Sequence, residues 1–173
     1  MSLVSNLQEQ VQQRLDELVG TGAEIGLQVA VFHRGDLVVD TVAGVADVDT
    51  GRPITSDTLF YSASTGKGAT ATVANLLVDR GLLDYDAPIG AVWPEFAVHG
   101  KDKATLRQVL THSIGLPAVP ADTTVEDLTD CTKMTEALAA AEPWWEPGTR
   151  MTYHAQTFGF LVGEIVRRAT GRP

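Results

Sequence analysis

The arrangement of apolar residues along the first quarter of the chain predicts a helix followed by two strands. The helix is predicted where apolar residues are three or four positions apart, at Leu7, Val11, Leu15 and Leu18. Gly20 is its predicted end. Residues 25–32 and 37–42 are rich in β-branched side chains, and the turn Arg34-Gly35-Asp36 separates them. This arrangement predicts a β-hairpin.

The remainder of the chain has mainly helical spacing. Residues 65–79 form one predicted helix, whose inward positions are Ala69, Val73, Leu76 and Leu77. Thr105 and Gln108 have the spacing of a capping box at the start of a second helix. Residues 124–141 and 158–169 are also predicted to be helical, and Gly171 is the expected stop.

A helix, then a hairpin, then several helices is an α+β order rather than an alternation of strands and helices. Two strands do not form a stable sheet by themselves. We therefore expect either that additional residues, downstream of Pro173 or on a second chain, complete the sheet, or that the two strands form an exposed edge. The expected organisation is one domain spanning 1–173, with a helix and hairpin over 1–63 and a helical layer over 64–173.

Composition excludes several classes of protein. With 173 residues, 44% hydrophobic and 20% charged, the chain is expected to be a soluble globular domain. Its formal net charge of −9 argues against nucleic acid and anionic membranes as partners. Cys131 is the only cysteine and the N-terminus lacks a signal-peptide pattern, which together favour a cytoplasmic protein. No metal-ligand spacing is present, and neither a metal nor another cofactor is expected.

The candidate chemistry begins with Ser64-Thr65-Gly66-Lys67 at the start of a predicted helix. Positions i and i+3 share a helix face, so the Lys67 amine can reach the Ser64 hydroxyl. A serine hydroxyl becomes a good nucleophile only when a neighbouring base takes its proton. Backbone N–H groups at the helix N-terminus can also stabilise a developing oxyanion. Taken alone, the tetrad does not establish catalysis. Ser64 would then be a helix cap and Lys67 a solvated surface residue.

Four segments resemble, in the same order, the serine β-lactamase and penicillin-binding protein superfamily. They are Leu59-Phe60-Tyr61-Ser62-Ala63-Ser64-Thr65-Gly66-Lys67, Leu110-Thr111-His112-Ser113-Ile114-Gly115-Leu116-Pro117, Glu146-Pro147-Gly148 with Tyr153, and residues 158–171. The resemblance is to class C-like β-lactamases, DD-peptidases and, above all, β-lactamase-like carboxylesterases. It implies the β-lactamase/DD-peptidase fold, an antiparallel sheet with a helical layer, of which this chain would be the N-terminal part.

The same resemblance implies that Ser64 is the nucleophile and that Lys67 and Tyr153 are the catalytic bases. One position departs from the family pattern, because Ala155 stands where an asparagine usually contacts the substrate amide. Losing that contact disfavours β-lactams and favours small esters. His154 is a candidate substrate-binding residue, with a partly exposed histidine of no special role as the alternative. His112 lies in a matched segment and is expected to be a structural hydrogen-bonding residue.

The expected function is therefore that of a serine hydrolase forming an acyl-enzyme on Ser64, with a small ester or amide as substrate. Carboxylesterase is the first choice, and β-lactamase or DD-peptidase is the alternative. A relative without catalysis, which binds a peptide or a partner protein, is the alternative of another class. The family's third active-site motif is not found in the sequence, so a C-terminal segment or a second chain is expected to complete the fold.

Overall fold

The computed structural model describes the backbone of residues 3–172 and the side chains of residues 6–172. It confirms an α+β protein with an antiparallel sheet. The chain divides into two compact units, residues 1–61 and residues 62–173. The expectation that both belong to one larger domain stays a prediction.

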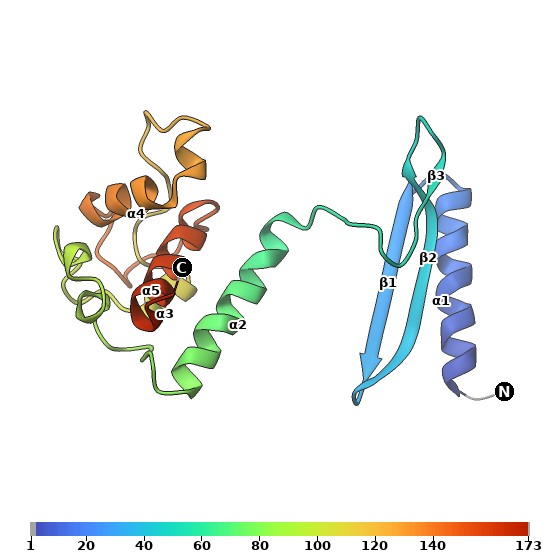
Figure 1. Ribbon diagram of the computed structural model, residues 1–173, viewed down its shortest axis with the longest axis horizontal. Coiled ribbons are helices and arrows are strands. Elements are labelled where there is room, and N and C mark those ends of the chain that lie inside the picture. Colours follow the sequence, from blue (N-terminus) through green and yellow to red (C-terminus); the bar gives the residue numbers. More distant parts are fainter. Residues whose placement is uncertain (1–2, 173) are drawn as a thin grey trace. The chain divides into compact units, whose positions relative to one another are not determined.

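The first unit contains one helix and a three-stranded antiparallel sheet (Figure 1). Its elements are α1 (Leu3–Gly20), β1 (Gly26–His33), β2 (Asp36–Asp47) and β3 (Arg52–Pro53). The predicted hairpin and the end of α1 at Gly20 are confirmed. The two-residue strand β3 pairs with the end of β2 through Val45 and Pro53.

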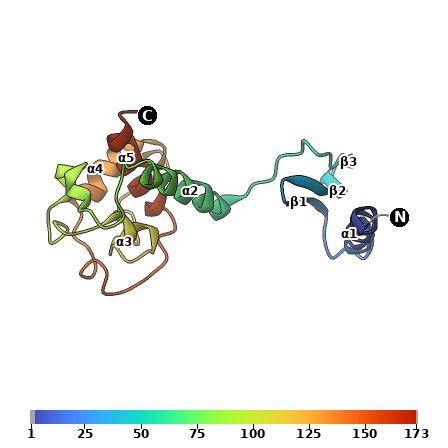
Figure 2. The same ribbon diagram turned by 90° about the horizontal axis from the view of Figure 1, so that it is seen from below.

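Helix α1 lies along β2, as two views of the unit show (Figures 1 and 2). Gln8 donates from Nε2 to the Asp40 carbonyl and accepts from the Asp40 N–H, both at 2.9 Å. Gln12 donates to the Val42 carbonyl at 3.1 Å. Since β3 pairs with β2 only near its end, these glutamines satisfy backbone groups on the part of β2 that β3 does not reach. The buried side chains of this unit include Leu15 and Val39.

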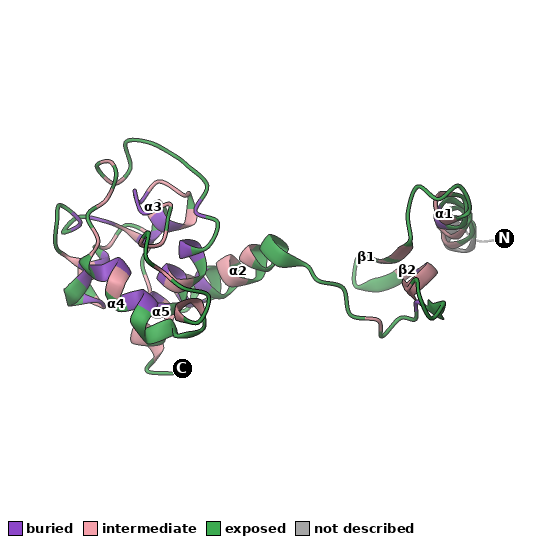
Figure 3. Ribbon diagram, turned by 90° about the horizontal axis from the view of Figure 1, so that it is seen from above, coloured by how far each residue is buried: buried purple, intermediate pink, exposed green. Residues whose placement is uncertain are grey.

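The second unit is helical and holds most of the buried core (Figure 3). Its elements are the 3₁₀ turn η1 (Ala63–Thr65), α2 (Gly66–Asp79), the 3₁₀ turns η2 (Ile89–Ala91) and η3 (Pro94–Phe96), α3 (Leu106–Leu110), the 3₁₀ turn η4 (Asp127–Thr129), α4 (Cys131–Ala140) and α5 (Thr157–Thr170). Helix α5 contacts α2, α3 and α4, so it organises the unit. Among residues 3–172, no helix is both long and apolar enough to cross a bilayer.

Several local predictions for this unit are confirmed and two are corrected. Thr105 and Gln108 form the capping box at the start of α3, and Gly171 ends α5 in the left-handed conformation. The helix expected over 124–141 begins later, at Cys131, because Asp130 caps it by accepting from the Lys133 N–H at 2.9 Å.

The inward face of α2 also differs from the prediction. Ala74 and Leu77 are buried, whereas the predicted inward residues Val73 and Leu76 are 48% and 43% exposed and Ala69 is exposed. Spacing alone therefore located the helix correctly but assigned part of its buried face wrongly. The unit buries only the stripe of α2 that meets α5.

Candidate active site

Ser64 lies in η1, immediately before α2. The preceding residue, Ala63, has a φ of 41°, in the left-handed region that residues other than glycine rarely adopt. The turn is closed by a hydrogen bond from the Thr65 N–H to the Ser62 carbonyl at 3.0 Å. The Ser64 residue is exposed. A strained residue directly before an exposed serine at a helix start is typical of a functional turn.

Lys67, one helical turn later, lies next to Ser64. Its Nζ donates to Ser64 Oγ at 3.2 Å and to the main-chain carbonyl of Ala155 at 2.6 Å. The first contact follows from helical spacing within one turn. The second contact joins α2 to the segment that precedes α5, and it aims the lysine amine at the serine.

Tyr153 reaches the same pair from the extended segment before α5. Its ring centroid is 5.0 Å from Lys67 Nζ. Hydrogen bonding with Ser64 is the largest influence on this phenol and lowers its pKa from the ordinary value of 10.0. Burial opposes the change, while hydrogen bonding to Lys67 and its positive charge lower the pKa further. The structure therefore brings Ser64, Lys67 and Tyr153 together and lowers the pKa of the phenol.

His154 follows Tyr153 directly in the chain and is buried. It is 1% exposed. Nε2 accepts from the Leu116 N–H at 3.1 Å, and Nδ1 lies 2.6 Å from the Thr152 carbonyl, to which it can donate. Both ring nitrogens are therefore used inside the unit, and the expectation that His154 binds substrate stays a prediction. Burial is the main cause that lowers its pKa, which fits a neutral ring with these partners.

Three further groups border the reactive side chains. The Ala155 carbonyl could not have been singled out from the sequence, since every residue carries one. Phe158 is buried on α5, and its ring centroid is 5.9 Å from Lys67 Nζ. His112 packs against Tyr153 with 4.8 Å between ring centroids. The sequence signal for His112 was its place in a matched segment, and its expected hydrogen bonding is found: Nδ1 accepts from the His154 N–H at 3.2 Å.

This arrangement is suited to nucleophilic chemistry. A hydroxyl beside an amine and a phenol of lowered pKa can lose its proton as it attacks an electrophilic carbon. Side chains that could hold a metal do not gather in groups of three or more among residues 6–172.

Comparisons with known proteins bear on the family. A family model described as beta-lactamase matches residues 11–173. The chain is 42% identical over 147 residues to the esterase/beta-lactamase LipL of Mycobacterium tuberculosis, covering 85% of this chain and 34% of that protein. It is 34% identical over 166 residues to penicillin-binding protein 4 of Amycolatopsis lactamdurans, covering 93% of this chain and 42% of that protein.

Solved structures agree with the sequence relatives. A family VIII carboxylesterase superposes with a TM-score of 0.91 at 40% identity, over 95% of this chain and 44% of that one. A penicillin-binding protein homologue from Caulobacter crescentus gives a TM-score of 0.88 at 38% identity, again over 44% of its length. The chain thus spans less than half the length of these relatives. The resemblance based on four segments is confirmed, and the chain belongs to the β-lactamase family.

Proposed function

We propose that the protein is a serine hydrolase that forms an acyl-enzyme on Ser64, and that it acts as a carboxylesterase on small esters. The observation that carries this proposal is the contact of Lys67 Nζ with Ser64 Oγ at 3.2 Å, with the Tyr153 ring centroid 5.0 Å from the same Lys67 Nζ. A serine at a helix end that served only as a cap would need neither partner.

In the proposed reaction Ser64 Oγ attacks the ester carbonyl carbon. Its proton passes to the relay that Lys67 and Tyr153 form together. The tetrahedral intermediate then expels the alcohol, which takes that proton as it leaves. Water next attacks the acyl-serine ester, its proton returns through the same groups to Ser64, and the carboxylic acid is released. Lys67 and Tyr153 thus act first as base and then as acid in each half of the cycle.

The residue at position 155 and the names of two relatives favour esters over β-lactams. Position 155 carries alanine, whose methyl group cannot accept or donate a hydrogen bond to a substrate amide. The Ala155 carbonyl already accepts from Lys67 at 2.6 Å. Among the relatives, LipL is named an esterase/beta-lactamase and one of the similar structures is a family VIII carboxylesterase. β-Lactamase or DD-peptidase activity is the second candidate, favoured by one relative named beta-lactamase and another named penicillin-binding protein 4.

The test compares p-nitrophenyl butyrate with nitrocefin on the full-length protein. We expect kcat/KM for the ester to exceed that for nitrocefin by about 10- to 100-fold, since an unpaired substrate amide costs on the order of 1–3 kcal/mol per lost hydrogen bond. Ser64→Ala should abolish both activities and covalent labelling by a fluorophosphonate. Ser62→Ala, which changes an exposed serine two residues away, is the matched control and should retain both.

The outcomes separate the candidates. A nitrocefin rate that rivals the ester rate reverses the ranking of substrates. Normal turnover in Ser64→Ala removes Ser64 from the mechanism. A protein that folds, hydrolyses neither substrate and is not labelled would be the binding relative without catalysis.

A further inference from the structure

His112 has an unusual place in the chain. It follows α3 with a φ of 59°, and its N–H donates to the Val109 carbonyl at 3.0 Å, while the next N–H, of Ser113, donates to the Gln108 carbonyl at 2.8 Å. These two bonds form the helix ending in which glycine usually occupies the left-handed position. A histidine in place of glycine at this position suggests that its side chain has a structural or functional role there.

His112 accepts two backbone hydrogen bonds, one from the residue before Tyr153 and one from the residue after it. The Thr152 N–H donates to the His112 carbonyl, and the His154 N–H donates to His112 Nδ1, both at 3.2 Å. One residue therefore holds the backbone immediately before and immediately after the proposed base. Since Nδ1 is the acceptor, the proton of the neutral ring is on Nε2.

The ring also backs the phenol directly. The His112 ring centroid lies 4.8 Å from that of Tyr153 and 5.0 Å from that of Phe158. The same ring is stacked on His154 at 5.6 Å. Burial and the positive charge of Lys67 both lower the pKa of His112, which keeps Nδ1 available as an acceptor at neutral pH.

We propose that His112 is the positioning residue of Tyr153: its carbonyl and Nδ1 fix the backbone around the tyrosine, and its ring holds the phenol within reach of Ser64 and Lys67. This inference rests on the proposed function, because its readout is the acylation of Ser64. His112 itself touches no reacting atom in this scheme.

The experiment compares two substitutions that both tolerate a left-handed backbone. His112→Asn places Oδ1 near the position of Nδ1 and preserves the acceptor, while His112→Gly removes both ring and acceptor. In the full-length protein we expect His112→Gly to lower kcat for p-nitrophenyl butyrate and the rate of fluorophosphonate labelling by about 10- to 100-fold, as small misplacements of a catalytic group do, with KM nearly unchanged. His112→Asn, which loses the ring but keeps the acceptor, should lose clearly less activity than His112→Gly.

Controls keep the result interpretable. His99 is also left-handed, with a φ of 54°, and is exposed, so His99→Gly should leave kcat unchanged. If His112→Gly does not fold, His112→Ala is compared with His99→Ala, since both alanines then carry the same backbone strain. Full activity in the His112 variants that lack the acceptor, or an equal loss in His112→Asn, overturns the inference. Normal turnover in Ser64→Ala would instead overturn the proposed function.

Discussion

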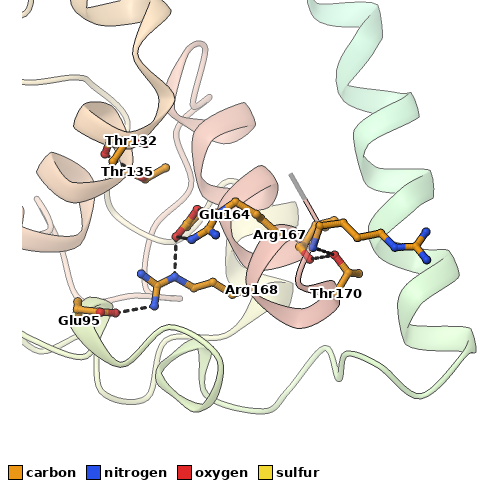
Figure 4. A network of polar contacts seen from close by, with 9 residues as sticks. Glu95, Thr132, Thr135, Glu164, Arg167, Arg168 and Thr170 are labelled. Carbon is orange, nitrogen blue, oxygen red and sulfur yellow. Dashed lines mark hydrogen bonds and ion pairs between the residues drawn. The ribbon is translucent and has the colours of Figure 1, made fainter.

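Glu164 is a buried carboxylate on α5 that pairs with two arginines of the same helix, one of which reaches η3 (Figure 4). It is 8% exposed and accepts from Arg167 Nε and Nη2 at 2.7 Å each and from Arg168 Nε at 2.6 Å. Arg168 in turn donates to Glu95 of η3 at 2.7 Å and lies 5.5 Å from the ring centroid of Trp93. We expect Glu164→Gln to destabilise the protein measurably without changing its chemistry.

The size of the effect follows from these contacts. Glutamine keeps one oxygen acceptor but turns an amide N–H₂ toward a guanidinium, and it removes the negative charge. A hydrogen bond to a charged group contributes about 1.5–3 kcal/mol where it is sheltered, as for Arg168, whose side chain is 24% exposed. The Arg167 side chain is 52% exposed, so solvent screening leaves its hydrogen bonds only a small share. The expected loss is therefore about 2–3 kcal/mol.

Urea unfolding of the full-length protein measures this loss. With a slope of about 2 kcal/mol per molar urea, the midpoint should fall by about 1 M. Hydrogen bonding to Arg167 is the main cause that lowers the pKa of Glu164 from its ordinary value of 4.5, with Arg168 adding to it and burial opposing it. Because the pKa is lower in the folded state, the stabilisation is fully present above pH 4.5 and is lost as pH falls through the lowered pKa. The difference in unfolding free energy between the unaltered protein and Glu164→Gln should therefore shrink as pH falls through the lowered pKa of Glu164.

The control is Glu136→Gln, which changes an exposed carboxylate on α4 and should alter stability by less than about 0.5 kcal/mol. A Glu164→Gln effect as small as that control would show that the buried network is not stabilising. If the difference between the two proteins does not shrink as pH is lowered progressively below 4.5, charge is not its cause. Changed kcat in well-folded Glu164→Gln would contradict the separation of this network from the chemistry.

Two further predictions concern the site and its supporting loop. Lys67→Met and Tyr153→Phe should each slow acylation by about 10²- to 10⁴-fold, and the double variant should lose far less than the product of the two, because groups of one proton relay fail together; additive losses in the double-mutant cycle would contradict the relay. Gly115→Ala should destabilise by about 2–4 kcal/mol in urea unfolding, because Gly115 has a φ of +87° and a Cβ there would lie 2.6 Å from the Trp145 carbonyl oxygen. Gly100→Ala, with a φ of +79° and open space around the Cβ, is the matched control and should cost about 1 kcal/mol.

The parts of the fold that could be predicted are those fixed by short-range rules. β-Branched residues on both sides of a tight turn predicted the hairpin, and the Thr105–Gln108 spacing predicted the start of α3. The tetrad from Ser64 to Lys67 likewise predicted a contact within one helical turn. Each of these features depends on residues that are close in sequence, so their spacing was enough.

The features that could not be predicted depend on residues distant in sequence. Val73 and Leu76 have the spacing of buried positions on α2, yet which stripe is buried depends on where α5 packs. The burial of His154 depends on Leu116, 38 residues earlier, whose N–H occupies its Nε2. A histidine beside a predicted catalytic tyrosine therefore suggested a pocket residue, although its partners lie on the other side, in the core.

The position of Lys67 shows how both kinds of information combine in the site. Helical spacing places its amine near Ser64, and any S-x-x-K helix start would do the same. The donation to the Ala155 carbonyl, 88 residues away, is what restricts the amine to one direction. That carbonyl belongs to the segment that carries Tyr153 and that His112 holds. One short segment therefore positions both proposed bases, which explains why a substitution at His112, outside the reacting groups, is expected to slow the same step as a substitution of either base.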